Sequence, residues 1–288
     1  MLTQEQVASY HDKGYIGIEG VLSAEEVEAL RRTTDEFVEK SRAVAESDAV
    51  FDLEPDHSAD SPKLRRLKSP VMQHEVYNQM LHHDRILDIV AQLIGERIRT
   101  NGDKLNMKSG AFGSPVEWHQ DWAFYPHTND DLLAVGVCID DMTEENGCLL
   151  VIPGSHKGPI YDHHLDGHFA GAVTVDDFDD RAAEKIELKA GGISIHHVRV
   201  LHGSLPNTSP NSRRLLLLQY CAGDAWPMVP PGDWESFGKS FVRGEPSQDI
   251  RCSDAPVRVP MPGAKHGGSI YSIQTVLRES TFKTVATG

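Results

Sequence analysis

Long apolar runs are absent from this sequence: no window of about 18 or more apolar residues occurs, so no transmembrane helix is expected. The N-terminal residues show no basic stretch followed by an apolar one, and we therefore expect no secretory signal. Basic residues are also few, with 28 Lys and Arg against 43 Asp and Glu and a net charge of −15. A phosphate backbone requires a basic surface. We expect neither a membrane nor a nucleic-acid partner.

Cysteine is scarce and widely spaced. The sequence contains Cys138, Cys148, Cys221 and Cys252, and no two of them form a Cys-x-x-Cys pair. This spacing argues against a disulfide framework and predicts reduced thiols in a cytoplasmic protein. Histidine, in contrast, is abundant, with 15 residues. Because histidine is the commonest metal ligand in proteins, its abundance directs attention to a metal site.

The character of the chain changes near residue 97. Before that point, Ser23-Ala24-Glu25-Glu26 is a capping box that begins a helix, and a second helix is predicted from Asp84 to about Leu93. Residues 45–62 are acidic and weakly periodic, which indicates a loop. After that point, short apolar segments separated by turn residues indicate strands at about 104–108, 132–139, 148–152, 193–197, 198–201 and 215–220. Many short strands are typical of a sandwich or barrel.

Three His-x-Asp tripeptides are candidates for part of a metal site. In an extended strand, residues i and i+2 point to the same side, so both can reach one metal. Two histidines and one carboxylate bind non-haem Fe(II) and leave positions open. The tripeptides that begin at His82 and His164 lie at a helix start and in a polar loop, where ordinary roles suffice. His119-Gln120-Asp121 follows an alternating segment, although a polar turn between strands explains it equally well.

A third ligand must come from a distant segment. His202 ends a predicted strand, and Arg213 begins the next apolar strand eleven residues later. His196 and His197 are alternatives for the third ligand. The planar guanidinium of arginine suits a dicarboxylate because it binds a carboxylate in a bidentate manner. Strand alternation puts Arg213 and Arg214 on opposite faces, so we expect only one of them to enter a barrel.

Three blocks of sequence together resemble the phytanoyl-CoA dioxygenase (PhyH) family of Fe(II)/2-oxoglutarate oxygenases. They are WHQDW at 118–122 with Tyr125-Pro126, ENGCL at 145–149 with IPGSH at 152–156, and HGS at 202–204 with Asn207, Ser209 and Arg213. The segments GY at 14–15 and LSAEE at 22–26 are also similar to the opening of the family. Residues after Trp226 match nothing that would name a substrate.

The resemblance implies a mainly β fold with flanking helices, built on a double-stranded β-helix, the jelly roll of cupin-like proteins. We expect a single oxygenase domain over residues 1–288. Residues 1–96 would form a mainly helical buttress with loops, and residues 97–222 the jelly-roll core with the metal site. Residues 223–288 would form an irregular covering segment with a short helix near 234–241.

The resemblance also implies Fe(II), 2-oxoglutarate and O2 as cofactor and cosubstrates. His119, Asp121 and His202 would hold iron and form the catalytic centre. Arg213, assisted by Ser204, would bind the distal carboxylate of 2-oxoglutarate. Lys104 and Asn106 share a strand face with Lys108, so the first two are candidates for the other end of the cosubstrate and Lys108 for the substrate. Aromatic and polar candidates for the substrate pocket, with core packing as the equal alternative, are Trp122, Phe124, Tyr125 and His127.

The function implied is hydroxylation of a small-molecule substrate with release of succinate and CO2. Asp121 favours this over halogenation, because related halogenases have a small residue at that position. The alternatives are a cupin-like metal-binding protein or isomerase without 2-oxoglutarate turnover, a zinc hydrolase and a non-catalytic protein. Family substrates include acyl-CoA esters, amino-acid derivatives and phosphonates, and the acidic chain argues mildly against a CoA ester. The oligomeric state stays open.

Overall fold

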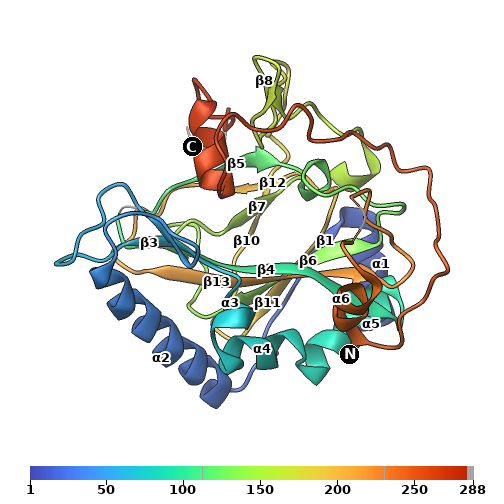
Figure 1. Ribbon diagram of the computed structural model, residues 1–288, viewed down its shortest axis with the longest axis horizontal. Coiled ribbons are helices and arrows are strands. Elements are labelled where there is room, and N and C mark those ends of the chain that lie inside the picture. The colour runs from blue at the N-terminus through green and yellow to red at the C-terminus, as the bar shows by residue number, and fades with distance from the viewer. Residues whose placement is uncertain (112, 230, 284–288) are drawn as a thin grey trace.

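Two antiparallel sheets lie one above the other in the computed structural model, which describes residues 1–111, 113–229 and 231–283 (Figure 1). The large sheet has the order β1-β11-β6-β13-β4-β3-β2, and β14 also pairs with β4. Its strands are β1 (Tyr15–Ile18), β11 (Ile193–His197), β6 (Leu132–Cys138), β13 (Arg213–Ala222), β4 (Ile98–Lys108), β3 (Leu64–Lys68), β2 (Phe51–Leu53) and β14 (Phe241–Arg243).

The small sheet has the order β10-β7-β12-β5. Its strands are β10 (Glu184–Ile186), β7 (Leu149–Val151), β12 (His202–Ser204) and β5 (Val116–His119), and a separate hairpin pairs β8 (His164–Leu165) with β9 (His168–Phe169). This two-sheet arrangement with few helices is the predicted jelly roll, and the fold class is confirmed.

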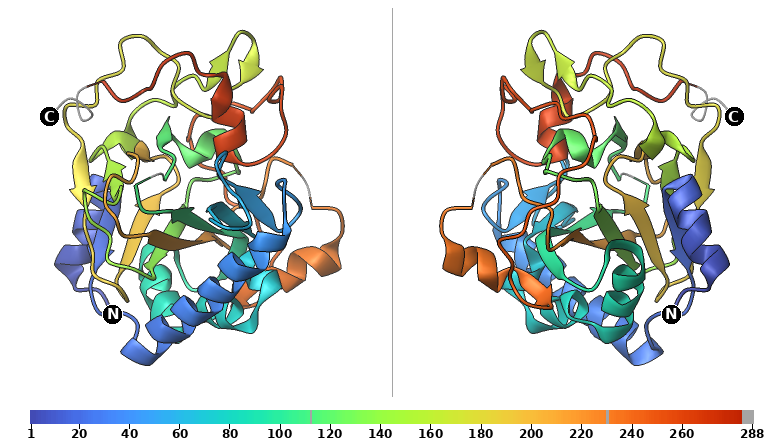
Figure 2. Two further views of the ribbon diagram at one scale, coloured as in Figure 1. Left: turned by 90° about the vertical axis from the view of Figure 1, so that its left-hand side faces the viewer. Right: turned by 90° about the vertical axis from the view of Figure 1, so that its right-hand side faces the viewer.

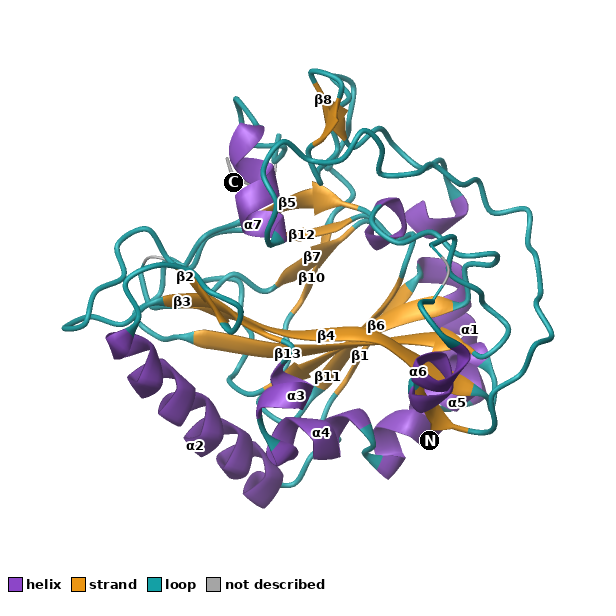
Figure 3. Cartoon of the chain, in the orientation of Figure 1, coloured by secondary structure: helices purple, strands orange, loops and turns teal. Residues whose placement is uncertain are grey.

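Helices cover the outer face of the large sheet (Figure 3). They are α2 (Ala24–Lys40), α3 (Pro70–Gln73), α4 (Glu75–Leu81) and α5 (Asp84–Ile94). The helix α1 (Gln4–Lys13) lies beside the edge strand β1, and α6 (Trp234–Lys239) and α7 (Ile270–Ile273) belong to the C-terminal segment. No helix in the described ranges combines the length and apolar character needed to cross a bilayer. Because helices lie on one face and the small sheet on the other, the central strands are apolar on both faces, and all seven residues of β6 are buried.

The predicted helix starts are confirmed, with one adjustment. Ser23 accepts from the backbone of Glu26 and Glu26 accepts from the backbone of Ser23, so the capping box begins α2 as expected. The second helix spans Asp84–Ile94, one residue beyond the predicted end. Its N-cap is His83 rather than Asp84, which is the first helical residue. Asp84 still suits that place, because a carboxylate stabilises the positive end of the helix dipole.

Two local predictions were wrong. The strand predicted at 198–201 is a turn in which Val200 N–H donates to the carbonyl of His197, because here the chain crosses from β11 in the large sheet to β12 in the small one. His202 therefore begins β12 instead of ending a strand. The loop predicted at 45–62 contains β2, which pairs with β3 and extends the large sheet. Periodicity could not identify β2, since three residues are too short for a pattern.

The C-terminal segment places α7, red in Figure 2, against the small sheet. In α7, Ile270 and Tyr271 are buried against Val116 of β5. A buried carboxylate holds the segment in place: Glu117 accepts from Thr281 N–H at 2.6 Å, from the Thr281 hydroxyl at 2.7 Å and from the Ser280 hydroxyl at 3.0 Å. The covering segment is thus tied to the strand that carries His119.

We expect Glu117→Ala to lower the free energy of unfolding by about 1.5–3 kcal/mol, because hydrogen bonds to a charged acceptor are lost and the Thr281 donors stay buried. Denaturant unfolding measures this loss, and limited proteolysis of residues 250–283 should become faster. Glu279→Ala, at a neighbouring exposed position, is the matched control and should change neither. Equal stability of the two variants would show that Glu117 does not hold the segment.

Candidate active site

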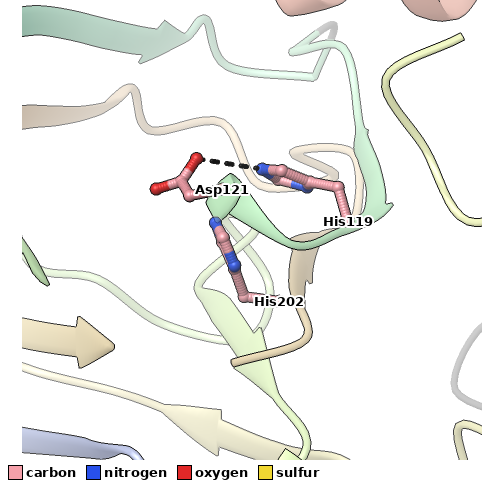
Figure 4. A group of neighbouring side chains, drawn as sticks. All are labelled: His119, Asp121 and His202. Carbon is pink, nitrogen blue, oxygen red and sulfur yellow. Dashed lines mark ion pairs between the residues drawn. The ribbon is translucent and has the colours of Figure 1, made fainter. Parts of the chain in front are cut away.

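His119, Asp121 and His202 come together between the two sheets (Figure 4). His119 ends β5, and Asp121 follows at the start of a short 3-10 turn. His202 begins β12 and lies directly opposite His119 in the strand register, so sheet pairing brings residues 83 positions apart into contact. One donor atom from each of the three side chains lies within 4.8 Å of the other two. All three side chains are buried.

Both histidines present an unprotonated nitrogen to the centre of this group. The Nδ1 of His119 is 2.8 Å from the carbonyl of Glu117, and the Nδ1 of His202 is 3.0 Å from the carbonyl of Val200. A carbonyl only accepts, so each Nδ1 is assigned the hydrogen and each Nε2 keeps its lone pair. Burial lowers the pKa of His119 to about 4 and holds that of His202 well below its ordinary value. Both rings are therefore neutral at neutral pH.

Asp121 supplies the negative charge. Burial alone would raise the pKa of this carboxyl group, but the charge of Lys104 and the contact with His196 outweigh it and hold the pKa well below its ordinary range. Metal ligands must be neutral histidine and ionised carboxylate, and a carbonyl behind each ring fixes its orientation. Two neutral rings, one carboxylate and these carbonyls fit a two-histidine, one-carboxylate Fe(II) centre.

A cavity of about 40 Å³ adjoins the three side chains. It lies between the sheets, because its walls come from β4, β6, β11 and β13 on one side and from β5, β7 and β12 on the other. Ile270 and Tyr271 of α7 also line it. The polar side chains that line this cavity besides the three above are Lys104, Asn106, His196, Ser204, Arg213 and Tyr271.

Arg213 enters the cavity and Arg214 does not. The guanidinium of Arg213 is 3% exposed, donates from Nη2 to the carbonyl of Gly147 at 2.9 Å, and has no partner for Nε among the described residues. Arg214 points to the other face of β13, where it forms ion pairs with Asp140 at 2.7 Å and with Asp35 at 2.5 Å. A buried cation with an unpaired N–H beside Ser204 is suited to an anionic ligand.

Lys108 does not line the cavity, although it follows the alternation of Lys104 and Asn106. Its ammonium is fully buried and donates to the carbonyls of Ser114, Ser204 and Leu205. Every donor of this ammonium is thus directed at backbone, and the contacts favour a structural role over the predicted substrate contact.

The four pocket candidates after Asp121 separate into different environments. Trp122 lies in the main core and donates from its indole N–H to the carbonyl of Pro256 at 2.8 Å. His127 is buried beside Arg99 and contacts the carbonyl of Tyr125 at 2.8 Å. Phe124 packs edge-on against the ring of His119, with 5.8 Å between centroids. Trp122, Phe124 and His127 do not line the cavity among the described residues. The fourth candidate, Tyr125, approaches Asp121 and forms a hydrogen bond with Gln219.

The other two His-x-Asp tripeptides lie elsewhere. His82 closes α4 and contacts the carbonyl of Asn78, and His164 in β8 pairs with Asp162 at 2.9 Å. Of the two alternatives for the third ligand, His197 packs against His156 outside the cavity, whereas His196 lies inside it. Tyr271 carried no sequence signal, because it belongs to the segment that matched no pattern.

Comparison with known proteins decides the family. The model of the phytanoyl-CoA dioxygenase (PhyH) family matches residues 10–215. A protein named probable alpha-ketoglutarate-dependent hypophosphite dioxygenase, from Stutzerimonas stutzeri, is 36% identical over 284 residues, which cover 96% of this chain and 99% of that protein. The chain belongs to the PhyH family.

Other PhyH-like proteins extend the comparison. L-Proline trans-4-hydroxylase from Streptomyces griseoviridis is 28% identical over 252 residues, 77% of this chain and 88% of its own. The crystal structure of EctD from S. alaskensis with bound iron has a TM-score of 0.66 and 24% identity, covering 87% of both chains. That structural likeness shows the shared fold.

This PhyH protein is a non-haem Fe(II)- and 2-oxoglutarate-dependent dioxygenase that hydroxylates a small-molecule substrate and releases succinate and CO2. Fe(II), 2-oxoglutarate (the alpha-ketoglutarate of the relatives' names) and O2 are its cofactor and cosubstrates, as the sequence blocks implied. The alternative of a cupin-like protein without 2-oxoglutarate turnover has no support among these relatives.

Proposed function

We propose that His119, Asp121 and His202 hold the Fe(II) of this dioxygenase. The supporting observation is the convergence of three buried donor atoms within 4.8 Å, two of them on neutral rings and one on an ionised carboxylate. Iron bound there would supply the activation of O2. The carbonyls of Glu117 and Val200 orient the two rings. Asp121 occupies the position that a halide would need, which supports hydroxylation.

Arg213 and Ser204 bind the distal carboxylate of 2-oxoglutarate in this proposal. They lie at one end of the cavity, and Arg213 keeps one buried N–H without a partner among the described residues. A guanidinium held by the carbonyl of Gly147 is already oriented before the ligand arrives, which reduces the entropy lost on binding. Ile270 and Tyr271 line the cavity, and their apolar surface would help to exclude water from the reacting groups.

The substrate that we propose is hypophosphite. The observation that supports it is the relative from Stutzerimonas stutzeri, which carries that name over nearly the whole of both chains. In the reaction, one oxygen atom of O2 is inserted into a P–H bond to give phosphite, and the other enters the new carboxylate of succinate as 2-oxoglutarate loses CO2. Phosphorus is oxidised by two electrons and the keto acid by two, which together reduce O2.

The test is turnover of the Fe(II)-loaded protein with 2-oxoglutarate and hypophosphite in air. We expect succinate and phosphite in equal amounts, measured by chromatography and by ³¹P NMR. L-Proline and ectoine, the compounds named for other relatives, serve as comparison substrates and should not stimulate succinate release. Stimulation by either of them, with none by hypophosphite, would contradict the proposed substrate.

We further propose that residues 1–288 act as one oxygenase domain in which residues 223–288 form the cover of the active site. The N-terminal residues 1–96 add β1, β2 and β3 to the large sheet and are therefore more than a helical buttress. The predicted cytoplasmic location is consistent with four free cysteines, of which three are buried.

A further inference from the structure

Lys104 is a cation without a partner at the edge of the proposed iron site. It extends from β4 into the cavity, and no hydrogen bond or ion pair with any described residue satisfies its ammonium group. The carboxylate that acts on it is Asp121, which is needed by the metal. The side chain is partly exposed, so its ammonium group is only partly desolvated, and an anion in the cavity would compensate that cost. Lys104 is therefore suited to receive a negatively charged ligand.

His196 is a second unpaired donor in the same cavity. Its ring is 2% exposed, and neither ring nitrogen has a hydrogen-bond partner among the described residues. Nε2 is 3.6 Å from Asp121, beyond hydrogen-bond distance, and the ring centroid is 4.2 Å from that of His202. Buried polar groups in native proteins are nearly always satisfied. An imidazole has at least one N–H, and the Asp121 carboxylate 3.6 Å from Nε2 is too distant to satisfy it, so this N–H is available to an oxygen atom of a ligand.

Asn106 adds a third donor on the wall between them. Its Oδ1 accepts from Nε of Arg66 at 3.1 Å, which assigns the amide nitrogen to the cavity side. No described residue accepts from that nitrogen. Lys104 and Asn106 point the same way because they are two residues apart in β4. The cavity wall beside Asp121 thus presents an ammonium, an imidazole N–H and an amide N–H.

These donors are distant from the proposed 2-oxoglutarate anchor. Lys104 of β4 lies opposite Leu217 of β13. Arg213 is four residues before Leu217 in β13 and lies opposite Lys108. At about 3.4 Å per residue, the two cations emerge roughly 14 Å apart along the sheet. One carboxylate cannot pair with both cations, so the two ends of the cavity suit two separate anionic groups.

The charges of the complete site leave one positive charge without a counterpart. In the function proposed above, Arg213 would be offset by the distal carboxylate of 2-oxoglutarate, and the two charges of Fe(II) by Asp121 and the other carboxylate of 2-oxoglutarate. Arg66 has its own neighbour, Asp52, directly across the strand pair. Lys104 alone remains, which calls for a ligand with a single negative charge. Tyr271 and Ile270 line the same cavity, and the substrate proposed above, hypophosphite, is a compact monoanion.

We propose that Lys104, His196 and Asn106 form the substrate subsite, which binds a compact monoanion beside the iron and is separate from the 2-oxoglutarate site at Arg213. This inference rests on the function proposed above and assigns its substrate-binding residues. Lys104 neutralises the charge of the anion, while His196 and Asn106 donate to its oxygen atoms and orient it toward the metal.

The test is anaerobic binding, in which no turnover occurs. Protein loaded with Fe(II) and 2-oxoglutarate is titrated calorimetrically with hypophosphite, formate and acetate, and binding of 2-oxoglutarate itself is titrated separately. Lys104→Met keeps the length of the side chain and removes its charge. We expect it to weaken hypophosphite binding by roughly thirty-fold or more, the usual effect of removing one partner of a buried charge pair, and to leave 2-oxoglutarate affinity and iron content unchanged.

His196→Phe keeps a ring of similar size without its N–H, and should weaken hypophosphite binding by about ten-fold or more. Lys239→Met, at an exposed helical position where the lysine pairs with Glu235, is the matched control and should bind as the parent protein does. Both active-site variants should retain the same ratio of iron to protein as the parent protein. If Lys104 and His196 served only to hold Asp121 in place, the variants would lose iron.

Each contrary result has one meaning. Unchanged hypophosphite affinity in Lys104→Met, in a parent protein that oxidises hypophosphite, overturns the subsite and leaves the proposed function intact. A rise in the 2-oxoglutarate constant instead shows that Lys104 serves the cosubstrate. If the parent protein binds formate or acetate through Lys104 but not hypophosphite, the subsite stands and the proposed substrate fails. No saturable binding of any of the three anions overturns the subsite.

Discussion

Alanine at His119, Asp121 or His202 should abolish substrate-dependent succinate formation and iron retention while the fold survives. Each replacement leaves two donors, and two donors cannot hold Fe(II) against competition from water and buffer. Loss of an outer-shell partner alone typically costs about 10–100-fold in metal affinity or activity, so loss of a ligand should exceed that range. Iron content after desalting and succinate release measure the two effects, and circular dichroism verifies the fold.

The controls for this experiment come from the histidines that the sequence offered as alternatives. His82→Ala and His164→Ala should keep iron and activity, because their contacts lie at α4 and in the β8 hairpin. His197→Ala should also keep iron, since that ring packs against His156 outside the cavity. An active His202→Ala variant together with an iron-free His197→Ala variant would mean that the third ligand has been misassigned.

Arg213→Ala should raise the apparent constant for 2-oxoglutarate by roughly thirty-fold or more. The guanidinium is buried, so its loss removes one partner of a desolvated charge pair, which typically costs about 2–5 kcal/mol of binding. Each 1.4 kcal/mol of binding free energy is about a factor of ten in the constant, so the lower limit of about 2 kcal/mol corresponds to a rise of roughly thirty-fold. Steady-state kinetics with varied 2-oxoglutarate measure it. Arg213→Lys should recover only part, because an ammonium cannot form the bidentate pair.

Arg214→Ala is the matched control for the cosubstrate experiment. This residue is adjacent in sequence but faces Asp140 and Asp35, so its loss should lower stability and leave the 2-oxoglutarate constant unchanged. Iron affinity without 2-oxoglutarate should stay the same in both variants, since neither residue touches the metal group. A larger kinetic effect at Arg214 than at Arg213 would contradict the assignment of the cosubstrate anchor.

Local regularities explain which features could be predicted from the sequence. The capping box at Ser23 depends on neighbours three residues apart, and it was confirmed. The opposite orientations of Arg213 and Arg214 follow from strand alternation alone, as does the common orientation of Lys104 and Asn106. The sequence blocks around His119 and His202 implied the family and hence the jelly roll. Such features are visible in sequence because they depend on spacing along one segment.

Contacts between segments needed the tertiary structure. The register of β5 with β12 brings His202, rather than His197, opposite His119, and the turn at 198–201 that makes this possible has the apolar composition of a strand. The 3-10 turn that begins at Asp121 sets the directions of the aromatic side chains around it. It therefore decides which of them pack in the core and which approach the metal group.

The sequence by itself indicated the class of chemistry, because the blocks around His119 and His202 together resemble the PhyH family. Only the tertiary structure decided the environment of Lys104 and His196, the place of Ile270 and Tyr271 in the cavity lining, and the separation of Lys104 from Arg213 along the sheet. The physical reason is that burial and charge compensation are properties of the space between two sheets, and distant segments define that space jointly.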